Sequence, residues 1–307
     1  MDTTTAGQRL TMPFLLKLLV TILLSFPLPV LAGESVPRYA VARQPTPVLN
    51  TPTFAAVFGG KDGATLKLDR CGQIRELEFI ALPGTVFRIE ATLPQGPATI
   101  YRVTSSDYPY PSKTGYYIDS RFVTASQEQP PERARRLPLR KTIIAALLAA
   151  QGESYVWGGN VSEGVPEMGK FYPPKTGSSP TSGQWTLAGL DCSGLLYEAT
   201  GGFTPRNTSA LVRYGRGISI AGLTASEIVQ KVEPLDLIVW DGHVQIVLDR
   251  ERLIESRLKC NGSGGVIVRP LREALTELVR HRKPLDAYGT AGKGKGFVLR
   301  RWFPAKP

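Results

Sequence analysis

The alternation of apolar and polar residues divides the chain into a β-rich part and a mixed part. Between about 45 and 125, β-prone runs alternate with turn residues: FAAVFGGKDGATLKL, IRELEFIALPGTVFRIEATL, ATIYRVT and GYYIDSRFVTA. Strand-length runs separated by Gly, Pro and Asp are typical of a small all-β barrel or sandwich. We therefore predict a β domain over 33–125, whose size fits an SH3-like barrel.

The second part of the chain mixes helical and strand patterns. A polar, proline-bearing linker is predicted over 126–140. KTIIAALLAAQG (141–152) predicts a helix that stops at its final glycine, and CSGLLYEAT predicts another. The runs DLIVW, HVQIVLD and LIESR predict antiparallel strands, and LREALTELVRHR (271–282) predicts an amphipathic helix. We expect 141–307 to be an α+β domain in which the cysteine-bearing helix packs on the sheet.

Residues 1–32 have the pattern of a secretory signal peptide. Arg9 and Lys17 precede the apolar run LLVTILLSF, and VLA ends at Ala32, a small residue that a signal peptidase accepts. An uncleaved membrane anchor is the alternative, but the apolar run is short for a span. Glu34 stands where a lipoprotein signal needs cysteine. We therefore expect cleavage after Ala32, contact with the membrane only during export, and a periplasmic or extracellular protein.

The chain is basic, and it stays so without the signal. Arg9, Lys17 and Asp2 leave with the signal, so the net charge falls only from +11 to +10. An exported protein of this charge suits an anionic surface such as the cell wall, although solubility explains most of the charge equally well. No basic stripe rich in aromatic residues is present, so we expect no nucleic-acid partner.

Three cysteines limit the redox chemistry of the chain. Cys71, Cys192 and Cys260 leave at least one thiol unpaired unless it bonds another chain. The chain has no CxxC motif and no histidine close to a cysteine, so a zinc site is poorly supported. We therefore predict neither a metal nor a cofactor. Cys71 and Cys260 form an interdomain disulfide or are two small buried residues. We favour two buried thiols, because nothing in the sequence pairs them.

Cys192 has the setting of a nucleophile. It lies at the predicted start of a helix, where free N–H groups and the helix dipole stabilise a thiolate. A nucleophilic thiol also needs a base, and the chain has two histidines. His281 lies in RHRK at the end of a charged helix and is interpreted as a surface residue. His243 begins the strand HVQIVLD and is the candidate base.

Glu255 is the candidate for orienting His243. The segment DRE predicts a hairpin turn centred at Arg250 or Asp249, and the second centre puts positions 243 and 255 opposite each other, with Cβ atoms about 4.5–5.5 Å apart. A Cys–His–Glu triad, with backbone N–H groups at the helix start as the oxyanion hole, would catalyse acyl transfer on an amide or ester. The alternative is that Glu255 is an exposed strand residue.

Six motifs together resemble the NlpC-type cell-wall peptidases, papain-like cysteine amidases that hydrolyse peptidoglycan stem peptides. In order they are YVWGGN (155–160), DCSGLL (191–196), TPRNTSAL (204–211), PLDLIVW (234–240), GHVQIVLD (242–249) and LIES (253–256). The resemblance covers about 141–270 and depends on the agreement of all six, because DCSG alone is a weak signal. It implies a papain-like catalytic domain preceded by an SH3-like barrel.

The resemblance also implies roles for single residues. Cys192 matches the nucleophile, His243 the base, and Glu255 the third polar residue, which is usually histidine. Further residues are implied at the oxyanion and substrate-binding positions: Tyr155, Asp191 and Ser193. The Tyr155 hydroxyl is expected near the nucleophile, and Asp191 is expected to hold the free amine of the terminal L-Ala of a stem peptide.

The implied protein is a monomeric cysteine endopeptidase that cuts the γ-D-glutamyl–diamino acid bond of peptidoglycan stems, where the diamino acid is diaminopimelate or lysine. Two departures qualify this. A carboxylate at 255 would raise the pKa of His243, and about thirty residues between Gly159 and Asp191 form an insertion expected to border the cleft. The alternatives are a non-catalytic wall-binding protein and a papain-like amidase or acyltransferase with another substrate.

Overall fold

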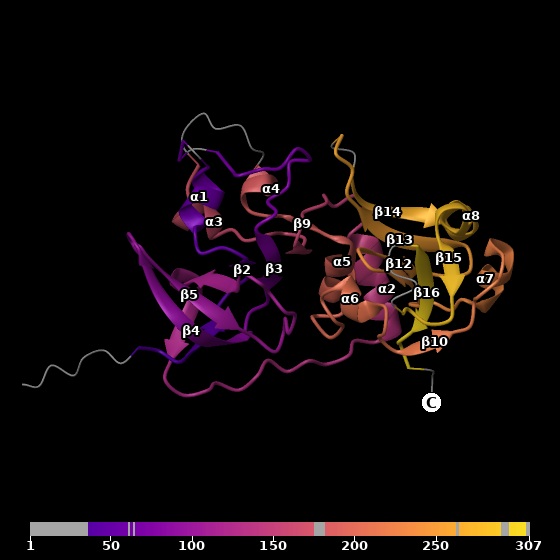
Figure 1. Ribbon diagram of the computed structural model, residues 1–307, viewed down its shortest axis with the longest axis horizontal. Coiled ribbons are helices and arrows are strands. Elements are labelled where there is room, and N and C mark those ends of the chain that lie inside the picture. Colours follow the sequence, from indigo (N-terminus) through magenta and orange to yellow (C-terminus); the bar gives the residue numbers. More distant parts are fainter. Residues whose placement is uncertain are drawn as a thin grey trace, which may run out of the picture. The chain divides into compact units, whose positions relative to one another are not determined.

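The computed structural model describes residues 36–60, 62–63, 65–174, 182–261, 264–289 and 295–304 (Figure 1). The predicted signal peptide over 1–32 lies outside these residues. Within the described ranges, none of the helices is both long and apolar enough to cross a membrane. The described chain contains two larger sheets, and each has its own apolar core.

The first sheet has seven antiparallel strands in the order β3-β2-β6-β5-β4-β1-β7. The strands are β1 (Tyr39–Ala42), β2 (Thr46–Leu49), β3 (Leu77–Ala81), β4 (Val86–Gln95), β5 (Ala98–Thr104), β6 (Tyr116–Asp119) and β7 (Val123–Ser126). Gly96, with φ of 59°, makes the tight turn between β4 and β5. All the predicted β-prone runs after the first contribute strands to this sheet. The comparison of this sheet with an SH3-like barrel stays a prediction.

One predicted strand run in the first part is a helix. Helix α1 (Phe54–Gly59) replaces the start of FAAVFGGKDGATLKL, and a short 3-10 helix, η1 (Ser120–Phe122), precedes β7. The prediction of β structure at 54–59 is therefore wrong. Phe54, Val57 and Phe58 are all buried, and their spacing of three and four residues gives a helix one apolar face.

The second sheet has the order β10-β16-β11-β12-β13-β14, and β15 pairs in parallel with β16. The strands are β10 (Arg216–Ile218), β11 (Leu237–Trp240), β12 (His243–Val247), β13 (Arg252–Arg257), β14 (Gly265–Pro270), β15 (Lys283–Leu285) and β16 (Gly296–Arg301). The other neighbouring strands are antiparallel, as predicted for β11, β12 and β13. A two-stranded pair, β8 (Asn160–Val161) with β9 (Gly189–Leu190), joins the two ends of the insertion.

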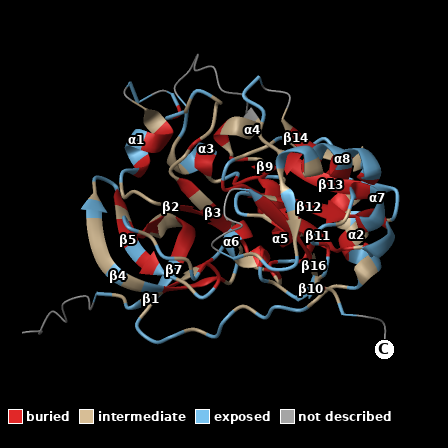
Figure 2. Ribbon diagram, turned by 45° about the vertical axis from the view of Figure 1, so that its right-hand side comes forward, coloured by how far each residue is buried: buried red, intermediate tan, exposed pale blue. Residues whose placement is uncertain are grey.

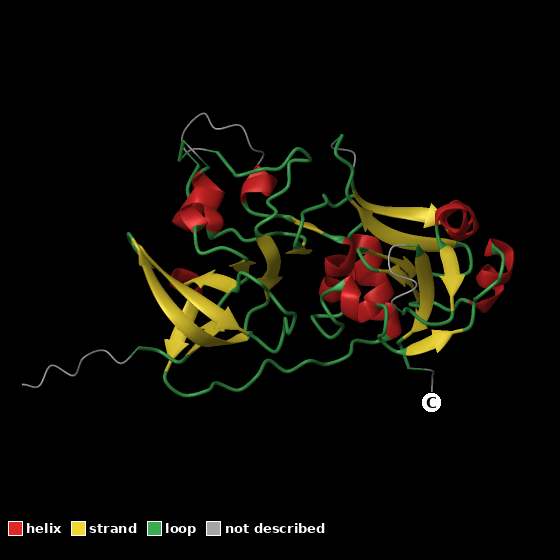
Figure 3. Ribbon diagram, in the orientation of Figure 1, coloured by secondary structure: helices red, strands yellow, loops and turns green. Residues whose placement is uncertain are grey.

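Helices cover both faces of the second sheet (Figure 3). Helices α2 (Arg140–Ala149) and α5 (Cys192–Ala199) pack on one face with α6 (Thr208–Leu211), and α7 (Ala225–Lys231) and α8 (Leu271–His281) pack on the other. Successive strand residues point to opposite faces, so Val244 and Ile246 join the α5 side while Val247 joins the α8 side. The strands β11 to β13 and helix α5 are therefore largely buried (Figure 2). This is the α+β arrangement expected for the second part of the chain.

The linker and the insertion are both attached to their surroundings. Arg133 donates to the Gly201 carbonyl at 2.9 Å and also pairs with buried Asp107 of the first part, so the predicted linker is fixed at its middle. In the insertion, α3 (Met168–Phe171) and α4 (Ser182–Trp185) place Met168 and Trp185 in the core of the first sheet. Residues 175–181 of the insertion lie outside the described residues.

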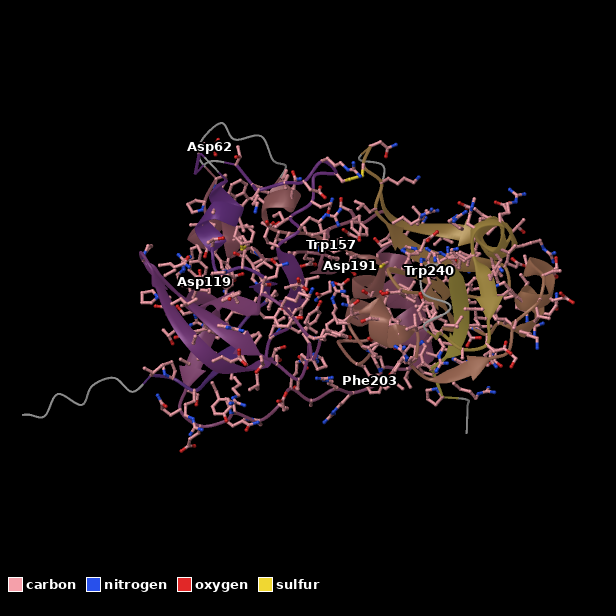
Figure 4. All side chains as sticks on the ribbon, in the orientation of Figure 1. Asp62, Asp119, Trp157, Asp191, Phe203 and Trp240 are labelled. Carbon is pink, nitrogen blue, oxygen red and sulfur yellow. A yellow bond between two sulfur atoms is a disulfide. The ribbon has the colours of Figure 1, made fainter. Side chains whose placement is uncertain are left out.

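Cys71 and Cys260 form a disulfide across 189 residues of sequence, with their Cα atoms 4.2 Å apart (Figure 4). The prediction of two buried thiols is therefore wrong. Cys71 lies in a turn held by Asp69, which accepts from the Cys71 N–H at 2.7 Å, and Cys260 lies in the loop after β13. Neither cysteine is buried, because each belongs to a loop that meets the other only in the folded chain. Cys192 is left as the free cysteine.

Candidate active site

Helix α5 presents Cys192 at its first turn. Asp191 caps the helix: its Oδ1 accepts from the N–H groups of Ser193, at 3.0 Å, and Gly194, at 2.6 Å. A capping carboxylate satisfies donors that a helix start leaves unpaired, and its charge suits the positive end of the helix dipole. Cys192 therefore begins the helix as the sequence predicts, although Asp191 uses two of the N–H groups that were candidates for the oxyanion hole.

Asp191 is also one half of a buried ion pair with Arg206. The guanidinium meets both carboxylate oxygens, Nη1 to Oδ1 at 2.9 Å and Nη2 to Oδ2 at 2.6 Å. Arg206 is 3% exposed, and although burial lowers the pKa of its guanidinium, the pairing with Asp191 outweighs this and raises it. The expected binding of a substrate amine by Asp191 stays a prediction. Its carboxylate already accepts hydrogen bonds from the Ser193 and Gly194 N–H groups and from Arg206.

Asn160 connects this ion pair to the first sheet. Its side chain is buried, accepts from the Ile80 N–H at 2.9 Å and donates to the Ile80 carbonyl at 2.7 Å, as a neighbouring strand would. The same Oδ1 accepts from Arg206 Nε at 3.0 Å. A continuous series of hydrogen bonds therefore joins strand β3 to the cap of helix α5.

His243 lies at the end of the second sheet, beside the start of α5. It opens β12 after the two-residue turn Asp241–Gly242, and Trp240 is its partner across the hairpin. Gly242 has φ of 100°, a conformation that favours glycine, and its N–H donates to Thr208 Oγ1 at 3.1 Å. The Cys192 sulfur lies 3.9 Å from the Gly242 carbonyl oxygen, which brings the thiol beside the imidazole.

Glu255 holds the imidazole from the opposite side. Its Oε2 lies 2.7 Å from His243 Nε2, which leaves Nδ1 as the ring nitrogen for the thiol. Of the two predicted hairpin centres the structure has the one at Arg250: Ile246 pairs with Ile254, so Glu255 faces Gln245 rather than His243. The contact forms nonetheless, because diagonal neighbours on one sheet face lie within reach of long side chains.

The carboxylate of Glu255 is buried, and protein side chains donate hydrogen bonds to both of its oxygens. Its Oε1 accepts from Arg269 Nη1 at 3.0 Å, and its Oε2 also accepts from Gln245 Nε2 at 3.2 Å. Burial raises the pKa of the Glu255 carboxyl, but the hydrogen bonds from His243, Arg269 and Gln245 outweigh it and lower the pKa to about 2. The alternative of an exposed strand residue is therefore wrong, since Glu255 is fully buried.

His243 is held in its charged form. Burial lowers the pKa of the imidazole, but its interactions with Cys192 and Glu255 outweigh this and raise the pKa to about 9. The hydrogen bond with Cys192 is the larger cause of this rise in pKa, and the carboxylate at 255 acts in the same direction, as expected. At neutral pH the imidazole is therefore an imidazolium between a thiol and a carboxylate, which is the charge state that stabilises a neighbouring thiolate.

Tyr155 lies near Asp191 and Cys192, as the resemblance implies. Burial first, and then the charges of Asp191 and Cys192, raise the pKa of its hydroxyl, so it stays protonated and can donate. Since the Ser193 and Gly194 N–H groups cap onto Asp191, the oxyanion hole expected at the helix start is reduced to the Cys192 N–H. Ser193 is instead a partner of Arg206, whose Nη1 donates to its hydroxyl at 2.9 Å.

A cavity of about 370 Å³ opens beside His243. Trp157 and Trp240, both labelled in Figure 4, line it together with residues of β13 and α8. His281, interpreted from the sequence as a surface residue, is exposed as expected and also lines this cavity. Within the described part of the chain, no group of three or more His, Cys, Asp or Glu residues is arranged to hold a metal ion.

Two arginines of the site were not singled out from the sequence. Arg206 and Arg269 each pair with a carboxylate of the site, Asp191 and Glu255. Arg206 does lie in one of the six motifs, TPRNTSAL, and a cation between two turn-forming residues was the available signal. Arg269 follows an apolar strand run, and no local pattern distinguishes it from a solvent-exposed strand residue.

Comparisons with known proteins do not identify the function of the chain. No protein-family model matches the chain, and no curated protein matches it. A solved NlpC/P60 family protein from Bacillus cereus ATCC 10987 is 16% identical, with a TM-score of 0.32, over 87% of this chain and 64% of that one. RipD from Mycobacterium tuberculosis, described as a non-catalytic NlpC/p60 domain protein adapted to peptidoglycan binding, is 18% identical, with a TM-score of 0.32, over 55% of this chain and 100% of that one. TM-scores of this size carry no argument about function.

Proposed function

We propose that the protein is a cysteine hydrolase of amide bonds, with Cys192 as nucleophile, His243 as acid and base, and Glu255 as the group that orients and charges His243. One observation carries the proposal. The one free cysteine of the chain begins a helix beside an imidazole whose Nε2 is held at 2.7 Å by a fully buried carboxylate. Nucleophile, base and orienting group in this order are the requirements of covalent acyl transfer.

The reaction follows from the protonation states. The Cys192 thiolate attacks the carbonyl carbon, and negative charge develops on the carbonyl oxygen. The C–N bond then breaks as His243 gives its proton to the leaving amine, which leaves a thioester. Neutral His243 next removes a proton from water, which attacks the thioester and releases the acid. The Cys192 N–H and the protonated Tyr155 hydroxyl, which lies near Cys192, are the candidate donors for the developing charge.

The proposed substrate is the stem peptide of peptidoglycan, at the γ-D-glutamyl–diamino acid bond. Six motifs in the order of the NlpC-type peptidases support it, and the basic charge of the chain suits an anionic wall. We also propose export, and the Cys71–Cys260 disulfide supports it, because such bonds persist in oxidising compartments. We further propose that the protein acts as a monomer and that Asp191 and Ser193 lie near the bound substrate.

Hydrolysis of purified sacculi and muropeptides, followed by mass spectrometry of the products, tests the proposal. The wild-type protein should release peptides, and Cys192→Ala and Cys192→Ser should both release none while retaining the wild-type unfolding curve. Iodoacetamide without reductant should add one label to the wild type and none to either variant. Peptide release by Cys192→Ala would refute the nucleophile. Binding of wild-type protein to sacculi without any release would favour a non-catalytic wall-binding protein.

A further inference from the structure

The cavity beside His243 does not include the thiol of Cys192 among its lining residues. Its lining begins at Tyr155, which lies near Cys192, includes His243, Gln245 and Glu255, and continues to α8. In the proposed reaction, which this inference rests on, His243 protonates the leaving nitrogen. The leaving amine must therefore approach the imidazole, and the groups attached to that amine extend into this cavity.

The cavity wall carries more positive than negative charge. Three arginines line it, Arg257, Arg269 and Arg282, against the two carboxylates Glu255 and Glu277. Arg269 binds both of these carboxylates. The protonated His243 adds to the positive side. A substrate group that binds in this cavity is surrounded by more cationic than anionic side chains. Binding of a negatively charged group is therefore favoured.

Two further guanidinium groups line the cavity. Arg257 Nη1 lies 3.7 Å from Glu255 Oε1, beyond hydrogen-bond distance, and this oxygen already accepts from Arg269 at 3.0 Å. Arg282 lies over the ring of Trp240, 4.7 Å from its centroid, and that ring is 5.1 Å from the His243 ring. Both side chains thus reach the cavity from different elements, β13 and the end of α8, close to where the leaving amine must lie.

We infer that this cavity is a carboxylate-binding subsite for the leaving part of the substrate, with Arg257 and Arg282 as the residues that bind the carboxylate. A planar guanidinium binds a carboxylate through paired hydrogen bonds, and charged hydrogen bonds of this kind are stronger than neutral ones. In a stem peptide the carboxylate has two sources. It is the side-chain carboxylate of diaminopimelate, which lysine lacks, or the C-terminal carboxylate of a peptide that ends at the diamino acid.

Four peptides separate these sources: L-Ala-γ-D-Glu followed by diaminopimelate or lysine, each with a free or an amidated C-terminal carboxyl. The lysine amide, which offers no carboxylate on the leaving side, should have the lowest kcat/KM, by about tenfold to a hundredfold. A preference for diaminopimelate in the amidated pair assigns the side-chain source, and a preference for the free acid in the lysine pair assigns the C-terminal source.

The arginines are tested by the ratio of kcat/KM between a preferred peptide and the lysine amide. Arg257→Gln and Arg282→Gln should each bring this ratio toward one. Arg280→Gln, which replaces an exposed arginine of α8 that does not line the cavity, should leave the ratio unchanged. Equal hydrolysis of all four peptides, or a ratio unchanged in both variants, would overturn the subsite and leave the proposed hydrolase standing.

Binding to Cys192→Ala, measured by calorimetry, separates the subsite from catalysis. The carboxylate-bearing peptides should bind about tenfold or more tightly than the lysine amide, and Arg257→Gln or Arg282→Gln in this background should remove the difference. If the wild type hydrolyses none of the peptides but this arginine-dependent binding is found, the proposed function fails and the subsite stands. Binding without any such difference overturns the subsite.

Discussion

At the scale of single residues, His243 is the group on which the proposed chemistry depends. Its imidazole lies between the thiol of Cys192 and the carboxylate of Glu255, and its pKa is raised to about 9. Glu255 in turn stays ionised because His243, Arg269 and Gln245 all donate to it. The position and the protonation of the imidazole beside Cys192 are thus governed by a carboxylate on its other side.

Replacing Glu255 by glutamine should move the pH dependence of the reaction. Without the carboxylate, the pKa of His243 falls from about 9 toward its ordinary 6.5. The reactive pair needs a protonated imidazole, so activity is lost as the pH rises through this pKa. The alkaline limb of kcat/KM should therefore shift down by about one to two pH units, and kcat/KM at neutral pH should fall about tenfold or more.

Glu277→Gln is the matched control for this shift. Glu277 binds Arg269, as Glu255 does, but it has no contact with His243. Its removal should leave the alkaline limb where it is. A Glu255→Gln protein with an unmoved limb would show that the carboxylate does not control the protonation of His243.

The buried ion pair at the helix cap should be costly to break. Asp191→Asn leaves the guanidinium of Arg206 buried without its counter-charge, so the free energy of unfolding should fall by about 3–5 kcal/mol. Urea denaturation measures the change. Asp249→Asn breaks an exposed pair with Arg252 and should cost far less, because solvent screens the two charges. Equal costs for the two variants would contradict a special role for the buried pair.

At the scale of elements, helix α5 fits its position because Gly194 has no side chain. A Cβ atom at this glycine would lie 1.9 Å from the carbonyl oxygen of Gly159 and 3.0 Å from Cβ of Asn160. The motifs DCSG and WGGN therefore meet in space, with their backbones in close contact. The helix start, the cap and the nucleophile all depend on this approach.

Gly194→Ala should displace the helix and lower stability. The added methyl group meets backbone atoms that cannot rotate away, so we expect a loss of about 2–4 kcal/mol in the free energy of unfolding and most of the activity. Gly169 is the matched control, since it is also helical and a Cβ atom added there would meet nothing within 4 Å outside its own helix. Gly169→Ala should be neutral or slightly stabilising. A Gly194→Ala protein as stable as this control would refute the close packing.

Elements whose signal is local could be predicted from the sequence, and contacts between distant loops could not. The apolar period predicts α2, α5 and α8, and the strand runs predict β11 to β13. The hairpin was expected with its centre at either 249 or 250, since turn residues alone do not fix the register. Asp191 was recognised by its motif, but its partner Arg206 is fixed by tertiary packing that no spacing encodes.

At the scale of the whole molecule, several side-chain bonds and a disulfide hold the first sheet against the second part of the chain. Asn160 binds the backbone of Ile80, Arg133 bonds both Asp107 and Gly201, and Cys71 is joined to Cys260. The disulfide ends on a loop that continues directly from β13, the strand of Glu255. The turn around Cys71 is also bonded to the segment that follows α2, because the Gln73 side chain accepts from the Trp157 N–H at 2.8 Å.

Removing the disulfide should lower stability more than it alters the catalytic groups. Cys71→Ser with Cys260→Ser frees a loop of 189 residues in the unfolded chain, which corresponds to about 3–5 kcal/mol. Thermal unfolding with and without reductant measures it: reductant should lower the Tm of the wild type and leave the double variant unchanged. A wild-type Tm insensitive to a reductant that demonstrably opens the bond would contradict this.

The position of the disulfide also determines what a protease can separate. The ring that it closes, from Cys71 to Cys260, contains the insertion together with Cys192, His243 and Glu255. A single backbone cut anywhere inside this ring leaves the two fragments joined as one covalent molecule. After such a cut, a nicked copy would migrate as intact protein under non-reducing conditions and as two fragments once the disulfide is reduced.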